Sequence, residues 1–168
     1  MITITNKEEI EKALFVASAV STDKTMDAMR FVLCEPDGET SRFVATDGHR
    51  AHWATMSEAH PAGAYEVIKK SKTELVLRRI TDAGQFPDYR SCIPAKTELD
   101  ISVDVLNQVW KTYTIFNRAH KFQDLALDYK YFCEAVSTAH TISTTADPHQ
   151  PVVFTGNYTG AVVMPCRM

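Results

Sequence analysis

Val44-Ala45-Thr46-Asp47-Gly48-His49-Arg50-Ala51 is the stretch of the chain that decides the fold. Two apolar residues enter a polar corner, and the chain leaves it through a histidine and an arginine. Asp-Gly favours a tight turn, because glycine adopts positive φ freely and aspartate hydrogen-bonds to nearby backbone. We therefore expect two strands, at residues 42–46 and 49–57, that meet at this corner.

The composition is that of an ordinary globular chain. Its 168 residues fit one ordinary domain or two small ones, and 45% of them are hydrophobic. The formal net charge of −3 does not indicate a strongly basic nucleic-acid binder. No apolar run approaches the roughly 18 residues of a membrane helix, and the charged N-terminal segment lacks a secretory signal. The four cysteines are far apart, which favours free thiols in a reducing cytosol. We expect a cytoplasmic protein with no membrane partner.

A first helix is expected over residues 7–20. Thr5 or Asn6 can cap its N-terminus, with Glu8 or Glu9 as the capping-box partner. Apolar residues recur at i, i+3, i+4 and i+7 along it, namely Ile10, Ala13, Leu14 and Ala17.

Alternating and apolar runs predict strands around two helices. In the first half the strands are expected at residues 2–4, 28–35, 42–46, 49–57, 64–68 and 73–80, and the second, third and fourth form an antiparallel meander. In the second half a strand at residues 99–103 leads into a helix at 103–117, and strands follow at 123–129, 131–136, 141–145, 152–155 and 159–167. Pro87 keeps the Phe86-Pro87-Asp88-Tyr89-Arg90 segment out of a helix interior, so an ordered connector is expected at residues 81–96.

The order of these elements repeats along the chain. A strand, a helix and several strands occur in half-repeats at about residues 1–80 and 97–168, and the connector joins them. The expected fold class is therefore α+β, with two helices packed on antiparallel sheets from a duplicated βα(β)n unit. We expect residues 1–168 to form a single domain.

The sequence contains no recognisable catalytic constellation. Asp47 and His49 are close together, but no serine or cysteine lies in a nucleophile motif. His49 and His52 are three residues apart in a predicted strand, so their side chains point to opposite faces and cannot easily share one metal ion. We expect no enzymatic activity, no metal site and no cofactor.

Three short motifs occur in order along the chain: A-T-D-G-H-R at residues 45–50, F-P-D-Y-R at 86–90 and V-V-M-P-x-R at 162–167. Together they resemble the bacterial DNA polymerase III β sliding clamp, in a shortened form with one clamp-like domain. Each motif is short, but their order and the position of the last one make the resemblance specific. The chain is similar to the first half of that family's middle domain and the second half of its last domain.

The resemblance implies a hydrophobic pocket that binds short linear motifs of polymerases and other DNA-processing proteins. Its residues in this chain would be Thr46, Gly48, His49, Arg50, Ala51, Pro87, Cys92, Val162, Met164 and Pro165. A methionine suits such a pocket because its side chain adapts to varied ligands. Clamp-like helices would face DNA, with Lys12, Lys111 and Arg118 as the candidate contacts.

The chain departs from the family at several of these positions. Ala51 replaces a leucine, Cys92 replaces an aliphatic residue, Cys166 replaces a methionine and Met168 a leucine. The first two changes remove volume, and a lost leucine contact weakens binding by about 1–3 kcal/mol. We expect a wider or shallower pocket with an altered motif preference, or one whose residues now serve only packing.

Two functions follow from the resemblance and stay open at this point. One is a DNA replication protein, a processivity clamp that binds polymerase or repair partners and encircles double-stranded DNA as a homo-oligomer; a closed ring would need about six one-domain copies. The other is a miniature peptide-binding module that recruits or competes for clamp-binding proteins without encircling DNA. Both place the protein in the cytoplasm of a bacterial or phage-infected cell.

Overall fold

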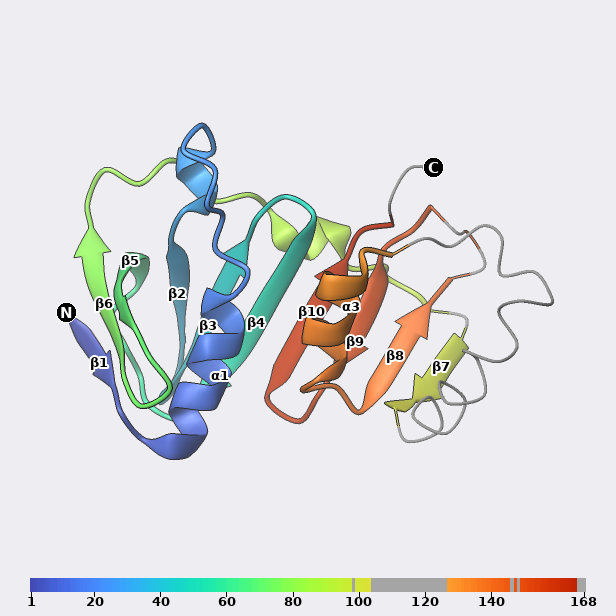
Figure 1. Cartoon of the computed structure of the whole chain (residues 1–168), viewed down its shortest axis with the longest axis horizontal. Coiled ribbons are helices and arrows are strands. Elements are labelled where there is room, and N and C mark those ends of the chain that lie inside the picture. Colours follow the sequence, from blue (N-terminus) through green and yellow to red (C-terminus); the bar gives the residue numbers. More distant parts are fainter. Residues whose placement is uncertain (98, 104–126, 146, 148, 166–168) are drawn as a thin grey trace. The chain divides into compact units, whose positions relative to one another are not determined.

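The computed structural model describes residues 1–97, 99–103, 127–145, 147 and 149–165 (Figure 1). The chain forms two compact units, Met1–Tyr89 and Arg90–Met168. Each unit contains antiparallel strands with a helix packed against them.

Six antiparallel strands form the sheet of the first unit. In pairing order they are β1 (Ile2–Ile4), β6 (Leu75–Ile80), β5 (Gly63–Lys70), β2 (Val32–Asp37), β3 (Thr40–Thr46) and β4 (Arg50–Met56). The predicted meander is confirmed, because β2, β3 and β4 follow one another in the chain and pair as neighbours. β2 begins later than expected because the residues before it include a short 3-10 helix, η1 (Asp27–Met29).

Helix α1 (Lys7–Ala17) begins where its cap predicts. The Asn6 side chain accepts hydrogen bonds from the backbone N–H groups of Glu8 at 2.9 Å and Glu9 at 3.4 Å. The helix ends before the predicted residue 20, because Ser18 closes its last turn and donates a side-chain hydrogen bond to the Phe15 carbonyl at 2.7 Å. The predicted cap is confirmed, and the predicted C-terminus was too late.

The apolar face of α1 covers β3 and β4, as Figure 1 shows. Ile10, Ala13 and Ala17 are buried as predicted, whereas Leu14 is only half-buried. Phe15, which lies outside the predicted face, is also buried. The helix therefore buries a wider stripe than its i, i+3, i+4, i+7 pattern indicates.

The described part of the second unit contains four antiparallel strands and one helix. In pairing order the strands are β10 (Thr159–Val163), β9 (Val152–Thr155), β8 (Thr141–Thr144) and β7 (Leu99–Ser102). Helix α3 (Tyr129–Val136) contacts β10. The Phe132 ring also meets the Phe154 ring of β9 in an edge-type contact, with a centroid distance of 5.8 Å.

Residues 131–136 belong to α3, so the predicted strand there is wrong. Aromatic residues in this segment favour a strand, but the local capping chemistry favours a helix. The Asp128 side chain accepts hydrogen bonds from the backbone N–H groups of Lys130 at 2.9 Å and Tyr131 at 3.2 Å. Ala135 is completely buried, as a residue on the inner face of a helix would be.

The fold class is confirmed as α+β: the described residues form two α-helices packed against antiparallel strands. The predicted helix at 103–117 and the predicted strand at 123–129 lie almost entirely outside the described residues. That the two units make up a single domain stays a prediction. Neither of the helices described is long and apolar enough to cross a membrane.

The connector after β6 is anchored to the first unit by its aromatic residues. The Phe86 ring lies against Phe31, with a centroid distance of 5.6 Å. Tyr89 is buried, donates a hydrogen bond to the Glu35 carboxylate at 3.0 Å and lies 6.1 Å from the Trp53 ring, centroid to centroid. A short 3-10 helix, η2 (Tyr89–Cys92), begins at this anchor.

Replacing Asn6 by alanine should lower the free energy of unfolding by about 1 kcal/mol, because two N–H groups at the start of α1 lose their acceptor. Urea denaturation followed by circular dichroism measures this change. Asn6→Asp keeps an acceptor at the same position and is the matched control. An alanine variant as stable as the aspartate variant would contradict the capping role.

Candidate functional site

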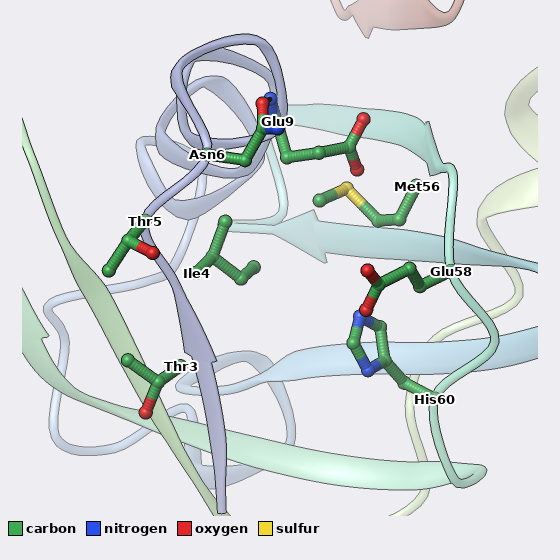
Figure 2. Close-up of a pocket in the computed structure, with 8 residues that line it drawn as sticks. All are labelled: Thr3, Ile4, Thr5, Asn6, Glu9, Met56, Glu58 and His60. Carbon is green, nitrogen blue, oxygen red and sulfur yellow. Dashed lines mark hydrogen bonds between the residues drawn. The ribbon is translucent and has the colours of Figure 1, made fainter.

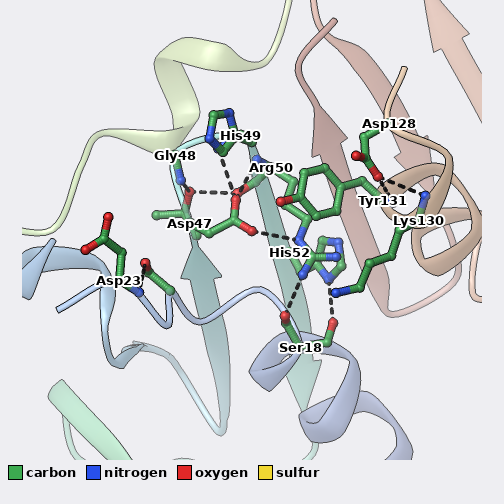
Figure 3. Close-up of polar contacts among 12 residues, drawn as sticks. Ser18, Asp23, Asp47, Gly48, His49, Arg50, His52, Asp128, Lys130 and Tyr131 are labelled. Atoms are coloured by element: carbon green, nitrogen blue, oxygen red, sulfur yellow. Dashed lines mark hydrogen bonds and ion pairs between the residues drawn. The ribbon is translucent and has the colours of Figure 1, made fainter. Parts of the chain in front are cut away.

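The corner between β3 and β4 is closed by its own side chains (Figure 3). The Asp47 carboxylate accepts hydrogen bonds from the backbone N–H groups of His49 at 3.0 Å and Arg50 at 3.1 Å. The Thr46 hydroxyl donates to the Arg50 carbonyl at 2.7 Å and accepts from the Gly48 N–H at 3.2 Å. Gly48 has a φ of 88°, which side chains other than glycine rarely adopt. The predicted tight corner is confirmed.

Arg50 joins this corner to the end of α1. Its Nε donates to the Asp47 carboxylate at 3.1 Å, and its terminal nitrogen donates to the Ser18 carbonyl at 2.6 Å. The residue is only 5% exposed. The guanidinium therefore holds the corner against the last turn of the helix.

His52 lies on the same buried face of β4 and has a structural role in the first unit. Its ring stacks on Phe15, with centroids 4.2 Å apart and planes 7° from parallel. Its Nδ1 lies 3.0 Å from the Phe15 carbonyl oxygen and 3.3 Å from the Ser18 hydroxyl (Figure 3). These contacts add a second link between β4 and the C-terminal turn of α1.

The corner presents some predicted site residues at the surface and buries others. Gly48 and His49 are exposed, whereas Thr46 and Ala51 are buried. Met29 was not predicted, yet its sulfur would lie 3.5 Å from a Cβ placed on Gly48. No local sequence signal marks Met29, because η1 brings it to the corner from another part of the chain.

The remaining predicted pocket residues occupy different environments. Pro87 is half-buried in the connector of the first unit. In the second unit, Val162 is buried within β10, Met164 and Pro165 follow that strand half-buried, and Cys92 is exposed in η2. That these residues form one pocket with the corner stays a prediction. Cys166 and Met168 lie outside the described residues.

Of the three predicted DNA contacts, Lys12 alone lies in the described part of the chain. Its ammonium is 2.6 Å from the Glu9 carboxylate, and its side chain is 18% exposed. Much of its charge is therefore balanced within the first unit. Lys111 and Arg118 lie outside the described residues.

A separate cavity of about 140 Å³ lies between β1, the start of α1 and the segment after β4 (Figure 2). None of the predicted site residues lines it. Glu9, one of the two expected capping-box residues, turns to this cavity instead. Its carboxylate accepts from the Ser57 backbone N–H at 3.0 Å and from the Lys12 ammonium.

The ionisation of Glu9 is coupled to these contacts. Partial burial alone raises the pKa of the carboxyl group, but the hydrogen bonds from Lys12 and Ser57 outweigh it and leave the pKa below its ordinary value. Glu9 is therefore charged at neutral pH in the folded protein.

The fold is that of the DNA polymerase III β sliding clamp. The solved β subunit of Thermotoga maritima matches 99% of this chain with a TM-score of 0.69 at 16% identity. The β sliding clamp of C. crescentus matches 99% with a TM-score of 0.67 at 18% identity. A β subunit of Eubacterium rectale matches 99% of this chain with a TM-score of 0.68 at 11% identity. In each case the match spans 65% of the solved chain, less than two thirds of its length. The sequence matches no protein-family model and no curated protein.

Replacing Arg50 by lysine should lower the free energy of unfolding by about 1.5–3 kcal/mol, because an ammonium cannot make both of the directed hydrogen bonds that the buried guanidinium makes. Denaturant unfolding measures the loss. Arg30→Lys alters an exposed arginine paired with Asp27 and should change stability little. Equal effects of the two substitutions would refute the anchoring role of Arg50.

The lowered pKa of Glu9 predicts a contribution to stability that depends on pH. Below the ordinary glutamate value of 4.5, the unfolded chain takes up a proton at this residue before the folded chain does. Stability should therefore fall as the pH drops through this range towards the folded-state pKa. Glu9→Gln should flatten that part of the profile, measured as unfolding free energy between neutral and acidic pH. A profile that is unchanged in the variant would count against the coupling.

Proposed function

We propose that this chain is a clamp-like, non-enzymatic DNA replication protein that binds short linear motifs of polymerase or repair partners. The observation that carries the proposal is the clamp fold across 99% of the chain, together with the clamp-like motif at the β3–β4 corner. The low identity of 11–18% to the solved clamps makes the corner, rather than overall similarity, the basis for assigning the site.

The geometry of the corner suits the recognition of a short peptide. His49 and Gly48 are exposed on a backbone that Asp47 and Thr46 hold in one conformation. A rigid site loses little conformational entropy when a flexible peptide binds to it. The Met29 side chain next to Gly48 adds an adaptable apolar surface.

The rest of the proposed pocket comes from Arg50, Ala51, Pro87 and, in the second unit, Cys92, Val162, Met164 and Pro165. In this proposal, Ala51 and Cys92 leave room for a larger anchor residue than the leucine and the aliphatic residue of the family would. Met164 and Pro165 are half-buried and can contact a ligand, whereas Val162 is buried within the second unit and Arg50 within the first.

Two assemblies remain within the proposal. A ring around double-stranded DNA requires a homo-oligomer and basic residues that face the DNA. The pairing of Lys12 with Glu9 favours the alternative, a peptide-binding module that does not encircle DNA. Sedimentation analysis separates the two, because a ring has a multiple of the chain mass.

A labelled peptide with a Gln-Leu-x-Leu-Phe type motif should bind saturably at micromolar concentration in a fluorescence-anisotropy titration. His49→Ala and Met164→Ala should each weaken binding by about three- to tenfold, the effect of losing one modest contact of roughly 1 kcal/mol. Both variants should remain folded by circular dichroism.

Matched controls are His149→Ala and Met26→Ala, which remove exposed side chains of the same types outside the proposed pocket. Their affinities should equal that of the wild type. If the site variants bind as tightly as these controls, the pocket assignment fails. If neither the wild type nor any variant binds the motif peptide at millimolar concentration, motif binding itself is excluded.

A further inference from the structure

The cavity beside β1 has a chemically distinctive lining (Figure 2). Ile4 and Met56, both buried, contribute apolar surface. The Glu9 and Glu58 carboxylates and the His60 imidazole contribute polar groups, and no lysine or arginine lines the cavity. The cavity lining therefore offers carboxylate oxygens as acceptors and no lysine or arginine as a charged donor.

The segment that carries Glu58 and His60 is held in place by hydrogen bonds from two directions. The buried Ser41 hydroxyl donates to the Glu58 carbonyl at 2.7 Å and accepts from the His60 backbone N–H at 2.6 Å. On the other side, Glu9 accepts from the Ser57 N–H. The His60 ring also lies against Phe43, with a centroid distance of 5.5 Å. The backbone that carries Glu58 and His60 is thus fixed before any ligand arrives.

The charges around the cavity do not cancel. Lys12 balances Glu9 from outside the lining, which leaves the Glu58 carboxylate as the other acidic group of the lining. An anion would be repelled by this arrangement. A metal ion is also disfavoured, since no group of three or more His, Cys, Asp and Glu side chains in the described part of the chain could hold one.

We propose that this cavity binds the side chain of an arginine presented by a partner polypeptide. The guanidinium would reach the Glu58 carboxylate and neighbouring acceptors, and its aliphatic stem would lie on Ile4 and Met56. A guanidinium has five N–H donors in a planar fork, which suits acceptors that approach from different walls.

The size of the cavity suits one side chain rather than a drug-sized molecule. At about 140 Å³ it is well below the volume of pockets that enclose drug-sized molecules. It lies wholly within the first unit and shares no residue with the proposed motif pocket. This second site is therefore independent of the proposed function.

The probe is Nα-acetyl-arginine amide, added to the isotope-labelled full chain and followed by NMR at the Ser57–His60 amides and the His60 ring. Saturable shifts at millimolar concentration are expected. Nα-acetyl-citrulline amide has nearly the same shape without the charge, and should bind at least about threefold more weakly, as expected for the loss of a partly exposed ion pair.

Glu58→Gln should weaken arginine-probe binding by about threefold, again the size of one partly exposed charge interaction. Glu39→Gln, at the exposed β2–β3 turn, is the matched control and should bind like the wild type. The absence of saturable shifts, equal binding of both probes, or an unchanged affinity in Glu58→Gln would each overturn the proposal. None of these outcomes involves the motif peptide, so failure here leaves the proposed function intact.

Discussion

The buried guanidinium of Arg50 is the contact on which the architecture of the first unit most depends. It joins the Asp47 carboxylate at the β3–β4 corner to the Ser18 carbonyl at the end of α1. Burying an unpaired charge is very costly, so the arginine stabilises the fold only while both partners are in place. One side chain thereby links the end of the helix to the corner.

This constraint gives the polar corner a fixed backbone with an exposed side. Asp47 and Thr46 use their side chains to satisfy the backbone of the turn, and His49 is left on the exposed side. His52 stacks on Phe15 beneath the helix and adds a second link between β4 and α1. A ligand at the corner would therefore meet a preformed surface backed by the core of the first unit.

Much of the fold could be predicted because it depends on local chemistry. The Asn6 cap, the Asp47-Gly48 corner and the alternation in β1 are all encoded within a few neighbouring residues. Helix α3 was missed because its aromatic residues favour a strand, and the Asp128 cap that decides the matter is a single residue upstream. The C-terminus of α1 was misplaced for a different reason, since it depends on Ser18 contacts made partly with a distant strand.

The candidate site likewise has features that the sequence predicts and features that it does not. The corner is recognisable from its motif, whereas Met29 reaches Gly48 only because η1 brings it there. The cavity beside β1 could not be predicted either, because its walls come from β1, α1 and the segment after β4. The Glu9–Lys12 pair, by contrast, is of a kind that helical i, i+3 spacing makes possible.

The central claim is that the corner belongs to a working site for clamp-binding motifs. The most direct test is an NMR titration of the isotope-labelled chain with an unlabelled motif peptide, which maps the contact surface residue by residue. Our account predicts saturable shifts at the Gly48 and His49 amides together with Met164, and none at the His60 cavity. Shifts confined to other surfaces, with the corner unaffected at saturation, would contradict it.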